Sequence, residues 1–154
     1  MSVYLLALLT GVIAGLRTFT APAAVSWAAR LGWLSAGDTA FAFMGYAWTS
    51  WILTLMALGE LVGDQLPFTP SRTVPMQFGA RLISGAFCGA AIGAAHGTVA
   101  GGAIAGVVGA VIGTLGGHSA RARLAAAFGN DHPAAFLEDA VAIAGAFLIM
   151  RGLA

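Results

Sequence analysis

The sequence predicts an all-α polytopic membrane protein with five or six transmembrane or re-entrant helices. Of its 154 residues, 59% are hydrophobic and only 8% are charged, whereas a soluble domain carries roughly 25% charged residues. So few charges cannot solvate the surface of a soluble domain of this length. The chain has room for about four to six spans of roughly 20 residues each, and we expect residues 1–154 to form a single integral membrane domain.

Composition also limits the classes of function. The formal net charge is +1, which gives no indication of a nucleic-acid partner. The basic residues are all arginine, so a catalytic lysine is not available. Cys88 is the single cysteine, which precludes an internal disulfide, and no Cys/His metal spacing occurs. Without a nucleophile–base pair, a Walker loop or a zincin motif, an enzyme is the less favoured class, and the sequence identifies no cofactor.

Six apolar segments follow one another along the chain. They cover residues 3–20, 21–34, 39–62, 76–95, 98–117 and 133–152. A loop with three prolines separates the third segment from the fourth. The second segment has only 14 residues. It either continues the first past a kink at Pro22, forms a re-entrant piece, or crosses as a short span.

Two short motifs occur once in each half of the chain. A Gly-x-Arg triplet appears as GLR and GAR in the first and fourth segments, and acids follow apolar residues in LGELVGD and FLEDAVA. This pattern suggests a duplicated three-segment unit with halves 3–62 and 76–152. Many transporters have such an architecture.

Glycines recur at intervals of four in the fourth and fifth segments. This spacing places small residues on one helix face, so that two backbones can approach closely. We expect the fourth segment to pack on the fifth in this way within the chain, and the alternative is that the glycines form the face of a homo-oligomer. The glycines concerned are Gly85, Gly89, Gly93, Gly97, Gly101, Gly109, Gly113 and Gly117.

Acids and arginines gather at segment ends that share one membrane face. Glu60 and Asp64 lie at the last turn of the third segment, and Arg81 lies in the second turn of the fourth. Ionisable groups inside a membrane are costly and indicate a functional site by default. The predicted binding residues are Arg17, Thr18, Glu60, Asp64, Arg72, Arg81, Glu138 and Asp139.

The position of Arg17 depends on the path of the second segment. If the first two segments form one kinked span, Arg17 lies roughly 20 Å from the charged face. If the second segment turns back, Arg17 joins the other charges. We favour the second arrangement, because an unpaired arginine in the middle of a bilayer costs at least about 2.5–3.5 kcal/mol. Arg72, Arg121 and Arg123 predict that the charged face is cytoplasmic.

Two interpretations of these charges remain open. They form either an Arg–carboxylate network that clamps the helices together or a polar cavity for a small ion or an anionic solute. We favour transport or permeation of a small solute or ion. Glu60 and Asp64 would bind a cation or a proton. Arg17, Arg72 and Arg81 would tune these acids or hold an anionic substrate.

Other functions remain as alternatives. One is a non-enzymatic lipid-binding or structural scaffold that oligomerises through the glycines, with membrane lipids as its partners. A lipid-phosphate enzyme ranks last, because no His or Ser constellation occurs at a plausible spacing.

Four motifs carry a resemblance to a known family. GLRTFTAPAA, GELVGDQLPFTPSRT, ARLISGAFCGAAIG and LEDAVAI occur in this order and are similar to those of the bacterial membrane family called domain of unknown function 4126. The similarity extends from about Leu9 to Ile149. It implies a small multi-pass protein of the bacterial inner membrane and assigns no activity to any residue.

Overall fold

The computed structural model describes residues 2–66 and 73–153, and the regular structure within them is helical. A short 3-10 turn, η1, precedes α3. The elements in chain order are α1 (Val3–Leu16), α2 (Thr20–Arg30), η1 (Ala42–Gly45), α3 (Ala47–Gly63), α4 (Pro75–Ala94), α5 (Val99–Phe128) and α6 (Asp131–Arg151).

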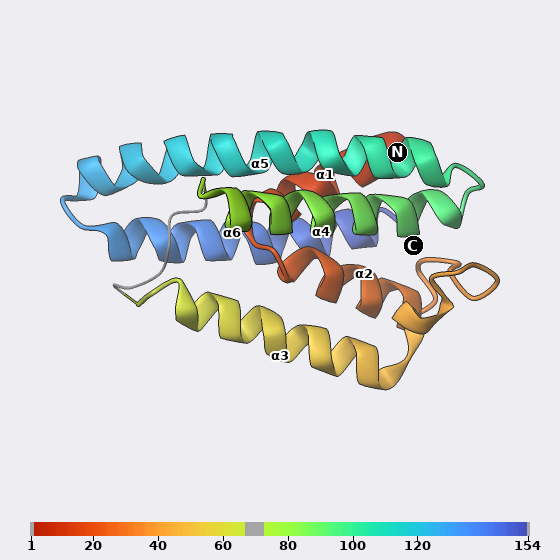
Figure 1. Ribbon diagram of the computed structural model, residues 1–154. Helices are drawn as coiled ribbons and strands as arrows, with labels where there is room; N and C mark the ends of the chain where they lie inside the picture. Colours follow the sequence, from red (N-terminus) through yellow and green to blue (C-terminus); the bar gives the residue numbers. More distant parts are fainter. Residues whose placement is uncertain (1, 67–72, 154) are drawn as a thin grey trace.

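The helices lie roughly parallel or antiparallel to one long axis (Figure 1). α1, α4 and α5 form the most extensively packed group, and α6 lies against α5, α1 and α2. α3 packs on α2 at the opposite edge of the bundle from α5. α1 runs toward the middle of the bundle and α2 runs back from there, so the two form an antiparallel pair rather than one continuous span (Figure 1).

Two helices in the described part of the chain are long and apolar enough to cross a membrane, namely α5 and α6. α1 and α3 are apolar but shorter, with 14 and 17 residues. At 1.5 Å per residue α1 is about 21 Å long, which is less than the hydrocarbon thickness of about 30 Å. α2 is shorter still, with 11 residues.

Several predicted boundaries need correction. The first segment was expected to extend over 3–20, but α1 ends at Leu16 and the chain turns before Pro22. Pro22 lies in the first turn of α2, where its missing N–H has no intrahelical partner to lose. The fifth segment was expected to end at residue 117, but α5 continues to Phe128 because the residues that follow are mostly alanine and arginine, which are good helix formers. It ends at Gly129, whose φ of 68° is the left-handed conformation that closes many helices.

The close approach predicted for the glycines occurs inside the chain. Cβ atoms placed on Gly85 and Gly106 would overlap each other's helix backbone, and Gly89 has the same relation to Gly102. On another face of α5, Gly109 lies directly against the backbone of α1 at Leu8. These faces are filled by neighbouring helices of the same molecule and are not open to a second copy. Gly97 has a φ of 72° and lies in the turn after α4 rather than on the helix.

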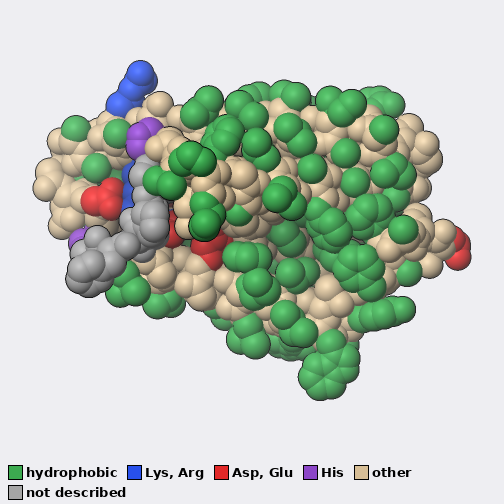
Figure 2. All heavy atoms as spheres, viewed as in Figure 1, with side chains coloured by type: hydrophobic (Ala, Val, Ile, Leu, Met, Phe, Trp, Pro, Cys, Tyr) green, Lys and Arg blue, Asp and Glu red, His purple; other side chains and the backbone are tan. Residues whose placement is uncertain are grey.

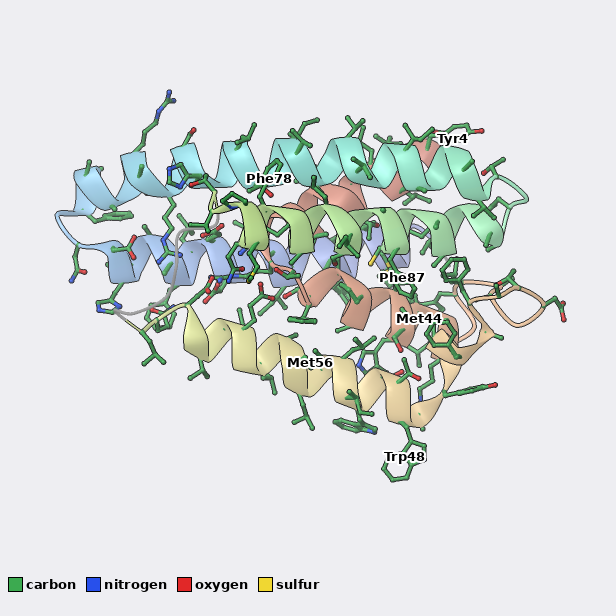
Figure 3. The ribbon with its side chains drawn as sticks, viewed as in Figure 1. Tyr4, Met44, Trp48, Met56, Phe78 and Phe87 are labelled. Atoms are coloured by element: carbon green, nitrogen blue, oxygen red, sulfur yellow. The ribbon has the colours of Figure 1, made fainter. Side chains whose placement is uncertain are left out.

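The outer surface is largely apolar, and most of its charged side chains gather toward one end, called here the charged end (Figure 2). On the face seen in Figure 2, most acidic, basic and histidine side chains lie toward one end, one acidic side chain lies at the opposite end, and many hydrophobic side chains lie between them. Large apolar side chains project outward from α3, among them Trp48, which is 81% exposed, and Met56 (Figure 3). Contiguous apolar surface of this extent is typical of proteins that associate with membranes.

The glycine contacts predict which substitutions the bundle tolerates. Gly106→Ala should lower the thermal unfolding temperature in detergent, because the added methyl group overlaps the Gly85 carbonyl and forces α4 and α5 apart. Overpacking of this kind costs about 1–3 kcal/mol. The matched control is Gly116→Ala on the same helix, where a Cβ meets open space; it should leave the unfolding temperature unchanged or raise it. Equal effects of both changes would contradict this packing.

Candidate functional site

The site forms where the chain breaks between α1 and α2. Arg17 leaves the helix with extended backbone angles, φ −141° and ψ 119°, and α2 begins three residues later at Thr20. The last carbonyls of α1 and the first amides of α2 have no partners within their own helices. In a buried position these groups need partners from elsewhere in the structure.

Arg17 is completely buried and forms ion pairs with two aspartates. Its two terminal nitrogens donate hydrogen bonds to Asp64, which follows α3, and to Asp139 in α6. The two aspartate side chains are only 15% and 13% exposed. A buried charge persists when it is paired and hydrogen-bonded, so Arg17 fixes α3 and α6 to the break.

Glu60 closes the other side of the break. One carboxylate oxygen accepts a hydrogen bond from the Thr18 amide at 2.6 Å, and the other accepts one from the Phe19 amide at 2.8 Å. These amides lead into α2, so the carboxylate also lies at the positive end of that helix. The nearest guanidinium nitrogen of Arg81 is 3.8 Å from Glu60. Glu60 thus accepts hydrogen bonds from two backbone amides and also lies beside the positive charge of Arg81.

The carbonyl groups at the end of α1 are bound from α4 and α5. Arg81 donates from one nitrogen to the Gly15 carbonyl at 2.9 Å and to the Leu16 carbonyl at 2.7 Å. The Thr114 hydroxyl on α5 also donates to Gly15, at 3.2 Å. Ser84, one turn after Arg81, donates to the Thr18 carbonyl at 2.6 Å. Every helix that surrounds the break therefore supplies a partner to it.

A second ion-pair group joins the ends of α5 and α6. Arg121 forms two hydrogen bonds with Asp131, at 2.9 and 2.5 Å, and lies 3.6 Å from Glu138. Asp131 is 59% exposed in its side chain, so part of this group faces solvent. Gln65 links the two groups, because it contacts Asp139 at 3.5 Å and His132 at 3.3 Å.

Most of the predicted site residues meet at the break. Arg17, Glu60, Asp64, Arg81 and Asp139 converge there through their side chains. Of the remaining three, Thr18 takes part through its backbone amide and carbonyl, Glu138 lies with Arg121, and Arg72 is outside the described residues. Arg17 joins the cluster as expected for a second segment that turns back.

Sequence reasoning missed the polar residues that are not ionised. Ser84, Thr114 and Gln65 all take part in the network, although none of them was among the predicted binding residues. For Ser84 and Thr114 the available signal was a hydroxyl group among the small and apolar residues of a glycine-rich helix. In the described part of the chain, no group of three or more His, Cys, Asp or Glu residues could hold a metal ion.

The contacts of Glu60 predict a role in folding. Glu60→Gln replaces one acceptor oxygen with an amide that faces a backbone N–H, so one buried donor loses its partner. Loss of a hydrogen bond to a charged acceptor costs about 1.5–3 kcal/mol, and the unfolding temperature in detergent should fall accordingly. Asp38→Asn, in the exposed loop between α2 and η1, is the matched control and should have no effect. An unchanged unfolding temperature for Glu60→Gln would show that these bonds contribute nothing.

Comparisons with known proteins place the chain in a family. No curated protein and no solved structure matches it significantly. A family model matches residues 4–151, which is nearly the whole chain and includes every helix of the break. The chain belongs to the family described as Domain of unknown function (DUF4126).

Proposed function

We propose that this chain is a multi-span inner-membrane protein that moves a small ion or solute, and that the cluster around Arg17 binds a proton or another monovalent cation. Glu60, given this role from sequence alone, is occupied by backbone amides. We therefore propose Asp64 and Asp139 as the residues that bind the cation.

The observation that carries the proposal is the balance of charge at Arg17. In the described part of the chain, Asp64 and Asp139 form their ion pairs with this single guanidinium. Two carboxylates and one guanidinium leave one negative charge in excess in a buried position. A proton or a monovalent cation shared between the aspartates would make the group neutral, which is the favoured state for buried ionisable groups.

The exposures of the three side chains indicate the direction of access. Arg17 is fully buried, whereas Asp64 and Asp139 are slightly exposed. A cation that arrives from the charged end therefore meets the carboxylates before the guanidinium. Helices broken near the middle of a bundle, as at α1 and α2, form ion and substrate sites in many transporters.

Binding at the aspartates would change how the helices are held. A proton or cation on Asp139 weakens its attraction to Arg17, and the same holds for Asp64. Each aspartate connects Arg17 to a different neighbour, one after α3 and one in α6. Occupancy would therefore loosen α3 or α6 from the α1–α2 break, and this couples binding to a movement of helices.

The membrane arrangement can be tested by labelling introduced cysteines. In a background without Cys88, cysteines at Ser2 and Ser35 should react with a membrane-impermeant maleimide from the same side, and one at Ser119 from the opposite side. All three positions are exposed, and Ser119 lies two residues before Arg121 on α5. Labelling right-side-out and inside-out vesicles separately shows from which side of the membrane each cysteine reacts. If the cysteines at positions 2 and 119 react from the same side, α1 and α2 form a single kinked span, which would contradict the proposed arrangement.

The transport proposal is tested by flux through reconstituted protein. Liposomes containing the protein and the pH dye pyranine, driven by a valinomycin-clamped potassium potential, should show proton flux above protein-free liposomes. The same vesicles assayed with ²²Na⁺ would detect sodium instead. Asp139→Asn should reduce the flux to background, because it removes a charge that the cation must balance, and Asp38→Asn should not.

Folding must be measured on the same samples. If Asp139→Asn remains folded by size exclusion and thermal unfolding but transports as the unchanged protein does, the cluster is a structural clamp. Absence of any proton or sodium flux from the unchanged protein would also overturn the proposal. Asp64→Asn provides an independent second variant, since it alters the other ion pair of Arg17.

A further inference from the structure

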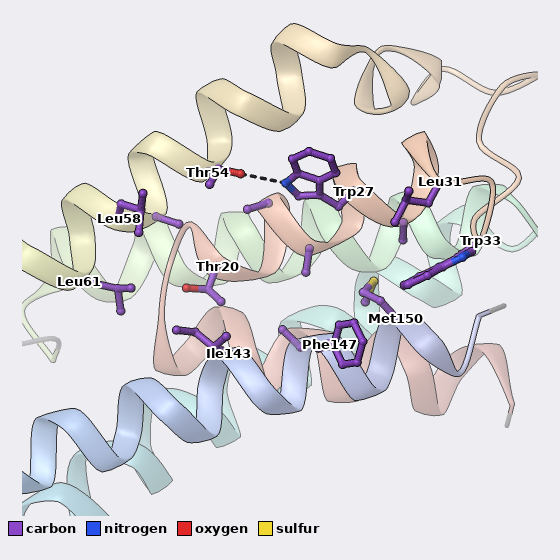
Figure 4. Close-up of a pocket in the computed structure, with 15 residues that line it drawn as sticks. Thr20, Trp27, Leu31, Trp33, Thr54, Leu58, Leu61, Ile143, Phe147 and Met150 are labelled. Atoms are coloured by element: carbon purple, nitrogen blue, oxygen red, sulfur yellow. Dashed lines mark hydrogen bonds between the residues drawn. The ribbon is translucent and has the colours of Figure 1, made fainter.

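An apolar groove lies between α2, α3 and α6, next to the Arg17 cluster. Its volume is about 390 Å³, within the usual range of about 300–1,000 Å³ for ligand pockets. α2 forms its floor, and α3 and α6 form its two sides (Figure 4). The lining is almost entirely aliphatic and aromatic, with side chains such as Leu58, Leu61 and Phe147.

The groove is elongated and its two ends differ. Thr20, Leu61 and Ile143 line the end nearest the break, and Leu31 and Trp33 line the far end (Figure 4). The groove follows α2 from Thr20 to Leu31, about 16 Å at the helical rise. This length suits an extended chain better than a compact solute.

Thr20 supplies an unused hydrogen-bonding group at one end. Its side chain is only 8% exposed, and within the described residues its hydroxyl has no hydrogen-bond partner. The other hydroxyl in the lining, that of Thr54, is satisfied, because it donates to the Ser50 carbonyl and accepts from the Trp27 indole. A buried hydroxyl without a partner costs about 1–3 kcal/mol, so a ligand that binds it would recover this free energy.

We infer that the groove binds a single acyl chain of a membrane lipid, whose carbonyl oxygen accepts a hydrogen bond from Thr20. The chain would extend along α2 toward Trp33, with its methyl end at the aromatic side chains. The polar end of the lipid would then lie at the break, on the side of the groove that faces the charged end of the bundle. The apolar lining gives affinity by burying the chain, and Thr20 fixes its register.

This inference uses the membrane placement proposed above but not the transport proposal. Thr20 and the groove-lining residues are distinct from Arg17, Asp64 and Asp139. Acyl binding can therefore be present without cation flux, or absent with flux retained. A readout of lipid binding alone separates the two proposals.

The probe is palmitic acid with a diazirine in the middle of its chain, added to the full-length protein in nanodiscs and activated by light. Peptide mass spectrometry should place the label on groove residues, chiefly Leu58 and Phe147. Ala24→Phe should block the labelling, because Ala24 lines the groove from α2 and is only half-buried, so a larger side chain can enter the space. Ala144→Phe, on the exposed face of α6, is the matched control and should leave it unchanged.

Thr20 is tested by a pair of conservative variants. Thr20→Val keeps the shape and removes the hydroxyl. It should raise the probe concentration for half-maximal labelling by up to roughly tenfold, which corresponds to the free energy of one neutral hydrogen bond. Thr20→Ser should retain most of the affinity. Equal labelling of Thr20→Val and the unchanged protein would overturn the role of the hydroxyl.

Other outcomes would overturn the groove itself. If the label is spread evenly over the outer surface, lipid only solvates this face. The same conclusion follows if Ala24→Phe stays folded but does not reduce the labelling. Competition by a compact solute but not by unlabelled palmitate would assign the groove to a different ligand. Labelling of groove residues in the unchanged protein without any proton or sodium flux would leave this inference intact and confine the failure to transport.

Discussion

The structure depends on compensation of the backbone at the break between α1 and α2. Ending one helix and starting another inside an apolar bundle exposes several N–H and C=O groups away from water. Glu60 takes two of the amides, and Arg81 takes two of the carbonyls. Arg17, at the break itself, then holds two aspartates. Eight of the 13 charged residues belong to this arrangement or to the adjoining Arg121 group.

The break also explains the glycine content of the neighbouring helices. α1 must lie close enough to α4 and α5 for Arg81 and Thr114 to reach the Gly15 carbonyl. Contacts such as that of Gly109 with the backbone of α1 permit this distance, and Gly15 itself has no room for a Cβ against α5. The small residues let α1 approach α4 and α5 closely, and the buried polar groups bind the end of α1 at that distance. The glycines that make these contacts therefore lie inside the bundle rather than at an interface with a second copy.

The sequence predicted the helical class, the approximate segments and most members of the charged cluster. It did so because apolar runs and isolated charges are local features that composition and spacing reveal. It did not predict that α1 ends at Leu16, because Pro22 is the local signal for a kink and a break stabilised by distant residues has no local signal. It also assigned Glu60 and Asp64 the same role. Their different partners, backbone amides for one and Arg17 for the other, depend on tertiary positions that a spacing of four residues cannot distinguish.

The groove and the ionic cluster share the same three elements, and this connects the two proposals physically. α2 starts at the cluster and forms the floor of the groove, while α3 and α6 border the groove and are tied to Arg17 through Asp64 and Asp139. A change in charge at either aspartate would therefore alter the spacing of the groove walls. Conversely, an acyl chain between α3 and α6 would favour one spacing of these helices, and by linkage it would alter the affinity of the aspartates for a cation by the same factor.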